Sequence, residues 1–299
     1  MTRLVSSSSA PGSRRTLTGR RTAAGGRGAL AAAVLTAAAL AAPARADEQP
    51  LWELGLGAGM LAFNNYRGSA TTHVWLLPVP YFVYRGELLK ADREGIRSLL
   101  LSQDRVELNL SVNATTPVRN DSARAGMPDL RSTFEVGPQL TVHLWRSADQ
   151  RVKLDLRVPV RAAFTFQAVP QYVGVFTNPN LSIDVDQFPG QGGWKFGVLA
   201  GPLFADHRYD EYFYGVAPEF ATATRPAYTA PGGYAGALVL ASVTRRYPSY
   251  WVGAYVRYDS LAGASFADSP LVRRENYWTA GFAVTWIIRQ SQRMVESEE

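Results

Sequence analysis

The chain has 299 residues, with 31 Lys and Arg against 25 Asp and Glu, three His and no Cys. The absence of cysteine excludes disulfide scaffolds, thiol nucleophiles and thiolate metal sites. Seven of the arginines lie in residues 1–46, which contain no Lys, Asp or Glu, so residues 47–299 carry 24 positive and 25 negative charges. A nucleic-acid binder needs basic charge in its folded part, and this nearly neutral body argues against that class.

The first 46 residues have the features of a secretory signal peptide. Several arginines precede an uncharged run from Ala29 to Ala42, and Ala44 and Ala46 supply the small side chains that signal peptidase accommodates. The run is shorter than the ~20 apolar residues of a spanning helix, which disfavours a membrane anchor. We expect cleavage before Asp47, an exported barrel over 47–288 and a charged tail over 289–299.

The exported part alternates apolar and polar residues with a period of two, which is the pattern of β-strands. Four segments show it most clearly: Trp52–Phe63, Val106–Thr115, Phe134–Trp145 and Arg151–Gln167. We expect further strands over Val74–Tyr84, Leu88–Leu101, Trp194–Phe204, Tyr209–Val216, Tyr234–Arg245, Trp251–Tyr258 and Tyr277–Ile288. The pattern over Leu88–Leu101 is ragged, with an interruption as the alternative near Arg93-Glu94-Gly95. In the first segment Gly55, Gly57 and Gly59 share one face, where missing side chains let a sheet bend sharply or leave room in a lumen.

Strand length separates two kinds of β protein. Strands of soluble sandwiches run about 5–6 residues, whereas the alternation over Arg151–Gln167 continues for the whole segment. Such a strand fits a tilted barrel wall that crosses a bilayer, and aromatic residues recur near the strand ends as in an interfacial girdle. The predicted fold is therefore all-β: a monomeric, closed antiparallel transmembrane barrel of about 12 strands, within a range of 10–14, in contact with outer-membrane lipid.

The polar faces of these strands predict which side chains line the lumen. The predicted lumen residues are Glu107, Glu135, His143, Lys153, Asp155, Arg157 and Arg161. Acidic and basic groups that face one another can line a water pathway or fill it with ion pairs, and a barrel of this width allows both.

The order of several short motifs resembles the MipA/OmpV family, the murein-transglycosylase-interacting proteins of the Gram-negative outer membrane. The motifs are Tyr66-Arg67-Gly68, Pro78-Val79-Pro80-Tyr81, Glu135-Val136-Gly137-Pro138, Gly201-Pro202, Tyr212-Phe213-Tyr214-Gly215-Val216, the run from Arg225 to Tyr234, and Asp268-Ser269-Pro270-Leu271-Val272. Barrel families commonly end their last strand on an aromatic residue, whereas this chain continues past Ile288 into a charged tail.

The resemblance implies a scaffold barrel that brings a lytic transglycosylase together with a bifunctional murein synthase. Candidate partner-binding residues lie in two motif loops: Arg225, Pro226, Tyr228, Gly232, Gly233, Ser269, Pro270 and Leu271. The alternative for these loops is purely conformational, with proline and glycine shaping turns and Arg225 satisfying loop carbonyls.

Two other functions stay open at this point. A porin, small-solute channel or stress-responsive outer-membrane protein is the main alternative. A lipid-modifying enzyme is a remote one, for which only His207, Asp206 and Ser269 can be combined, and nothing in the sequence brings them together. With three scattered histidines, at 73, 143 and 207, we expect no catalytic residue, no metal and no cofactor.

Overall fold

The computed structural model describes residues 47–85, 89–92, 95–98, 101–103, 105–186 and 193–297. The predicted signal peptide and its cleavage residues Ala44 and Ala46 lie outside the described residues. Fourteen strands form one antiparallel sheet: β2 (Trp52–Asn64), β3 (Thr72–Arg85), β4 (Leu89–Asp92), β5 (Gly95–Ser98), β6 (Leu101–Gln103), β7 (Val106–Ala114), β8 (Thr133–Arg146), β9 (Val152–Thr165), β10 (Tyr172–Thr177), β11 (Asn180–Val185), β12 (Trp194–Ala205), β13 (Gly233–Arg246), β14 (Tyr250–Ser260) and β15 (Asn276–Gln290). A second sheet pairs β1 (Asp47–Pro50) with β16 (Met294–Ser297).

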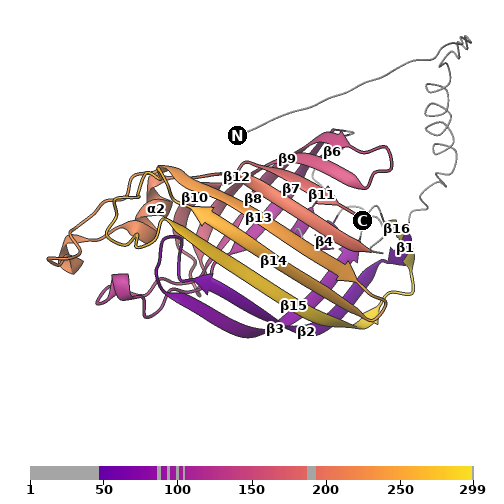
Figure 1. The fold of residues 1–299 in the computed structure, drawn as a ribbon, viewed down its shortest axis with the longest axis horizontal. Helices are drawn as coiled ribbons and strands as arrows, with labels where there is room; N and C mark the ends of the chain where they lie inside the picture. The colour runs from indigo at the N-terminus through magenta and orange to yellow at the C-terminus, as the bar shows by residue number, and fades with distance from the viewer. Residues whose placement is uncertain are drawn as a thin grey trace, which may run out of the picture. The chain divides into compact units, whose positions relative to one another are not determined.

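The strand order of the main sheet is β5-β4-β3-β2-β15-β14-β13-β12-β10-β9-β8-β7-β6, with β11 between β9 and β12. The first and last long strands, β2 and β15, are paired with each other. The order therefore starts and ends in the middle of the chain, at β5 and β6. Because Ser98 and Leu101 are three residues apart, their Cα atoms lie within ~11 Å, so the two ends of the sheet come close together. Figure 1 shows the long strands inclined side by side around this sheet.

The two ends of the strands differ in their connections. At one end, next to β1 and β16, the connections are short, as between β8 and β9 or between β13 and β14. At the other end they are long and contain the 3₁₀ helix η1 (Ser122–Arg124), the helix α2 (His207–Tyr214) and the 3₁₀ helix η2 (Pro218–Phe220). Figure 1 shows α2 at the end opposite to β1 and β16. No helix in the described part of the chain is long and apolar enough to cross a membrane.

The predicted alternation gives the sheet two different faces. Large apolar side chains are exposed on the outer face, for example Leu76 at 79% and Ile288 at 67% of full exposure. The opposite, inner face carries the polar side chains, which are buried or half-buried. A wide apolar exterior is the surface expected of a protein that is embedded in lipid.

The glycine series on β2 faces the neighbouring strand β15 at close range. A Cβ atom on Gly57 would overlap the backbone carbonyl oxygen of Val284 and the Cα of Thr285. Gly137 of β8 has the same relation to the carbonyl oxygen of Val160 on β9. The glycines thus permit close approach of adjacent strands.

Four predictions are corrected by the structure. The segment 88–101, expected as one strand with an interruption as the alternative, contains the two strands β4 and β5, which pair antiparallel with each other. Residues 209–216 were expected to form a strand, but His207–Tyr214 form a helix, because the Asp206 side chain accepts a hydrogen bond from Tyr209 N and caps it. The tyrosines and phenylalanine of this helix therefore lie among the long loops and are not part of an aromatic girdle. Tyr81 was expected among the girdle residues near the end of the strand over 74–84, but its hydroxyl points inward and donates to Glu53. The last long strand runs to Gln290, and the charged tail beyond it contains β16.

Candidate functional site

The long connections pack into an ordered body, which we call the loop layer: residues 65–71, 115–132, 206–232 and 261–275. The largest cluster of buried apolar side chains lies here and on the adjoining strand ends: Tyr66, Val118, Ala123, Leu130, Phe176, Leu203, Ala205, Phe213, Tyr214, Val216, Ala230, Ala235, Leu238, Leu261, Ala264, Phe266 and Leu271. At its centre the rings of Tyr214 and Phe266 stack with centroids 3.6 Å apart. The loops are therefore held by a hydrophobic core of their own.

Arg225 is buried within the loop layer, with 7% of its surface exposed. Its Nη1 donates to the carbonyls of Ala123 at 3.1 Å and Ala125 at 2.8 Å, and its Nε and Nη2 donate to the carbonyl of Phe220. One side chain thus ties the connection after β12 to the connection after β7. This geometry favours the conformational interpretation of Arg225 over direct contact with a partner.

The other family motifs meet in the same layer. Tyr66 Oη donates to the carbonyl of Leu271 at 2.8 Å, and Ser269 Oγ donates to the carbonyl of Tyr214 at 2.7 Å. Tyr214 Oη in turn donates to the carbonyl of Arg67 at 2.9 Å. Motifs that are far apart in the sequence therefore form one hydrogen-bonded unit.

The remaining motif residues lie at the margin of the layer. Tyr228 forms a backbone bridge with Val216 and is half-buried, whereas Pro226 is exposed and Pro270 is half-buried. Gly232 packs against the backbone of residues 205–207, and Gly233 starts β13 with φ +137°, a conformation that favours glycine. Of the candidate partner-binding residues, Pro226 is thus the non-glycine side chain most available to another protein.

Sequence reasoning missed Asp121, which organises the loop layer from the connection after β7. Its carboxylate accepts hydrogen bonds from Asn65 Nδ2, Ser69 Oγ and Ala123 N, at 2.9, 2.5 and 2.9 Å. No short motif marks this role, because Asn65 and Ser69 lie in another loop.

Asp210 of α2 is a buried carboxylic acid, 1% exposed, whose Oδ2 has no hydrogen-bond partner among the described residues. Burial raises the pKa of its carboxyl to about 7, with a smaller raising effect from Asp206 and a lowering effect from Arg67. Near neutral pH this group changes charge inside the loop layer.

The predicted lumen residues lie on the inner face, where they form ion pairs with one another or with other residues of that face. His143 contacts Asp155 at 3.0 Å and Glu107 at 3.4 Å, and Arg146 contacts the same Asp155 at 2.7 Å. Arg157 binds Asp184 at 3.0 Å. These contacts join β7, β8, β9 and β11 across the sheet.

A second set of pairs extends this network towards both ends. Lys153 and Lys195 bind the two oxygens of Asp186, at 3.2 and 3.4 Å. Glu135, which is 1% exposed, accepts a 2.9 Å hydrogen bond from Tyr209 of α2 and lies 3.9 Å from Arg161. The Tyr209 contact connects the loop layer directly to the inner face.

A third group was missed by sequence reasoning. Glu53 on β2 is fully buried and contacts Arg85 Nη1 at 3.1 Å, Arg246 Nη2 at 2.9 Å and Tyr81 Oη at 3.0 Å. Arg246 lies on β13, separated from β2 by two strands in the sheet order. Glu53 therefore connects strands that are not adjacent in the sheet, and no local sequence pattern predicts such a contact.

The residues sketched for an enzyme are used elsewhere. His207 Nδ1 contacts the carbonyl of Ala230 at 2.6 Å, Asp206 caps α2, and Ser269 Oγ bonds to Tyr214 O. The three side chains therefore do not form the hydrogen-bonded series of nucleophile, base and acid that a catalytic triad requires. Among the residues that the structure describes, no group of three or more His, Asp or Glu could hold a metal ion.

Known proteins that are similar to this chain include outer-membrane proteins. The family profile described as "MltA-interacting protein MipA" matches residues 56–288. Outer membrane protein Omp26La of Vibrio anguillarum and outer membrane protein OmpV of Vibrio cholerae serotype O1 are each 25% identical over 213 residues, which cover 69% of this chain and 76% of each relative. Among solved structures, LpxR from Salmonella typhimurium covers 78% of this chain and all of its own, with a TM-score of 0.41 and 10% identity.

Proposed function

Because the chain belongs to the MipA family and is an outer-membrane protein, we propose that it is a closed β-barrel that holds a lytic transglycosylase and a bifunctional murein synthase together and performs no chemistry itself. The observation that carries the proposal is the pairing of charged groups on the inner face beneath an ordered loop layer. Such an interior is suited to rigidity, and the family description names an interaction with MltA.

Closure of the barrel rests on the strand order. β5 and β6 are the two ends of the main sheet and are separated by residues 99–100 alone, and β5 also lies beside β7. If β5 with β6, and β10 with β11, each share one position in the wall, the described strands occupy 12 positions, which is the size expected from the sequence. A closed wall leaves no unpaired edge in lipid, which membrane strands require.

Orientation follows from the lengths of the connections. Outer-membrane barrels have short turns on the periplasmic side and long loops outside. The side with short turns contains β1 and β16, which form a small sheet of their own, and β16 pairs there with no described strand other than β1. We assign partner binding to this periplasmic sheet, because an exposed strand edge is a common site for adding a strand from another protein.

The test is capture of purified murein enzymes by the folded, full-length protein. Val295→Pro removes a backbone donor within β16, where Val295 is paired with Gln49, and should abolish capture of the lytic transglycosylase. Val295→Thr keeps the backbone and should bind as the unmodified protein does. Heat-modifiable migration of both variants monitors the barrel. Equal capture by both variants would contradict binding through this sheet.

The channel alternative has its own measurement. Paired charges on the inner face and the packed loop layer are expected to leave no conducting path, so purified protein in a planar bilayer should give no reproducible single-channel steps. Regular conductance steps that disappear after heat denaturation would show that the protein forms a pore and would contradict the scaffold proposal.

A further inference from the structure

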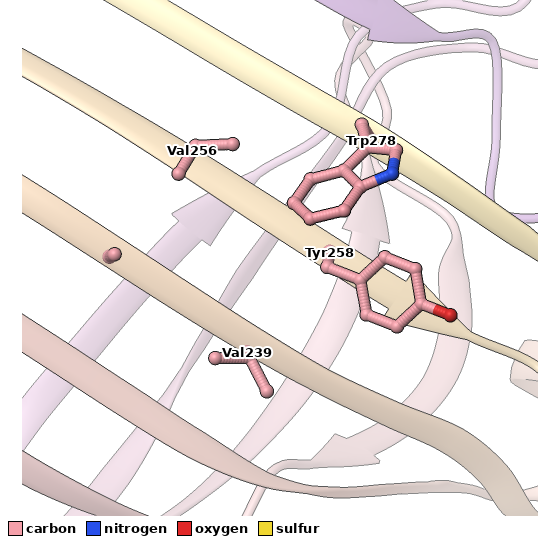
Figure 2. Close-up of a pocket in the computed structure, with 5 residues that line it drawn as sticks. Val239, Val256, Tyr258 and Trp278 are labelled. Atoms are coloured by element: carbon pink, nitrogen blue, oxygen red, sulfur yellow. The ribbon is translucent and has the colours of Figure 1, made fainter. Parts of the chain in front are cut away.

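The outer face carries an apolar groove near the loop layer. Val239 and Ala241 of β13, Val256 and Tyr258 of β14, and Trp278 of β15 surround a shallow hollow of about 340 Å³. Figure 2 shows the rings of Tyr258 and Trp278 at one end of it and the two valines along the strands. The groove is lined almost wholly by carbon, so an apolar chain fits it better than water does.

The register explains why a hollow forms here. Val239, Tyr258 and Trp278 are directly paired across the three strands, and the next row consists of Ala241, Val256 and Ala280. Bulky rings in one row beside two alanines in the next create a step on the sheet surface. The row that contains Tyr258 and Trp278 lies two residues from the strand ends Ser260 and Asn276. The groove therefore runs from the loop side of the sheet into its apolar outer face.

Polar groups lie at the loop end of the groove. Tyr258 Oη donates to Asn276 Oδ1 at 2.9 Å. Just before Asn276, Arg273 and Arg274 are exposed, and the backbone N–H groups of both donate to the carbonyl of Gly68, at 2.8 and 3.1 Å. Neither arginine has an ion-pair partner among the described residues, and the neighbouring charge is Glu275, which is also exposed.

We propose that this groove and the arginine pair bind one lipid of the outer leaflet that carries a phosphate group, with an acyl chain in the groove and the phosphate at Arg273 and Arg274. Guanidinium groups bind phosphate through paired, charge-assisted hydrogen bonds. The fixed backbone of the two arginines lowers the ordering cost of such binding. The proposal rests on the membrane-barrel part of the proposed function and is independent of any murein enzyme.

Native mass spectrometry of the folded, full-length protein can test this with two probes that share their acyl chains, dioleoyl phosphatidic acid and dioleoylglycerol. We expect phosphatidic acid to be retained about tenfold more strongly, the size of one charged hydrogen-bond contact. The double change Arg273→Gln and Arg274→Gln should remove this preference, and Ala241→Phe, which fills the groove, should weaken retention of both lipids.

Matched controls use the same residue types elsewhere. Arg119→Gln, at an exposed loop position, and Trp286→Phe, on the outer face at the other end of β15, should leave the preference unchanged. Equal retention of the two lipids, an unchanged preference in the double variant, or a dimer of the chain in place of a lipid adduct would overturn the proposal. Heat-modifiable migration is measured alongside, so a failure of the barrel itself is distinguished from a failure of lipid binding.

Discussion

The loop layer and the inner face are stabilised by different interactions. In the loop layer the buried side chains are mostly apolar, and the buried Arg225 bonds to neutral carbonyls. On the inner face the buried groups are polar, and among the described residues the buried carboxylates there lie near cations, as Glu53 does near Arg246. The first region resembles the core of a soluble domain, while the second depends on pairing of opposite charges.

This difference follows from what surrounds each region. The wall exposes its apolar side chains outward to lipid, so the alternation of a strand leaves polar residues for the interior. The loops project beyond that wall, where hydrophobic burial can operate as it does in water-soluble proteins. Changes to the inner face should therefore act through unpaired charge, and changes to the loop layer through lost packing and lost hydrogen bonds.

The largest effect is expected from Glu53→Ala. Arg85 and Arg246 lose their shared carboxylate within the wall, which should lower the free energy of unfolding by about 3–5 kcal/mol. Urea unfolding of the protein in lipid vesicles measures the change. Asp149→Ala, which breaks an exposed pair with Arg151, is the control and should unfold as the unmodified protein does. A Glu53→Ala protein of unchanged stability would refute the role of charge pairing.

Asp210 should make the loop layer sensitive to pH. Burial raises the pKa of its carboxyl to about 7, against about 3.9 in the unfolded chain, so the contribution of Asp210 to stability is most favourable below pH 4 and becomes less favourable as the pH rises to about 7. Between pH 5 and pH 8 the loss should reach at most about 3 kcal/mol. We expect loops that resist proteinase K better at pH 5 than at pH 8.

The variant Asp210→Asn should remove most of this pH dependence, because an amide does not titrate. Asp129→Asn, at an exposed loop position, is the matched control and should retain it. If the Asp210→Asn loops kept the full difference between the two pH values, the sensitivity would belong to another group.

Arg225→Ala separates the two interpretations of the Arg-Pro-x-Tyr motif. Loss of its bonds to three carbonyls should weaken the loop layer by about 2 kcal/mol and speed loop proteolysis, while the barrel keeps its heat-modifiable migration. Arg119→Ala serves as the comparison. Weaker capture of murein enzymes with unchanged loop protection would instead indicate direct partner contact by Arg225.

The smallest effect is expected where the two regions meet. Tyr209→Phe removes the hydrogen bond to Glu135 and keeps the ring, which stacks on Phe176 at 5.3 Å. We expect a loss of about 1 kcal/mol in urea unfolding. Tyr228→Phe, whose hydroxyl has no such partner among the described residues, should have no measurable effect. A larger loss for Tyr209→Phe would mean that the two regions unfold as one.

Much of the wall could be predicted from the sequence, because alternation is a local pattern. The strands expected over 106–115 and 151–167 correspond to β7 and β9, and their polar residues lie on the inner face. The helix α2 was missed because Tyr209, Phe213 and Tyr214 also suit a strand, and the cap at Asp206 decides between the two. The partners of Glu53 and Asp121 could not be predicted, since they come from distant parts of the chain.

The pairing of β2 with β15 also has a consequence for how the chain folds. Glu53 lies opposite Gln290, so the wall is joined there by contacts between the first and last long strands. Contacts between such distant segments form slowly, because a long stretch of chain must first be ordered. The wall therefore becomes complete only after the C-terminal strand is available, and a chain that lacks β15 should leave β2 as an open edge prone to aggregation.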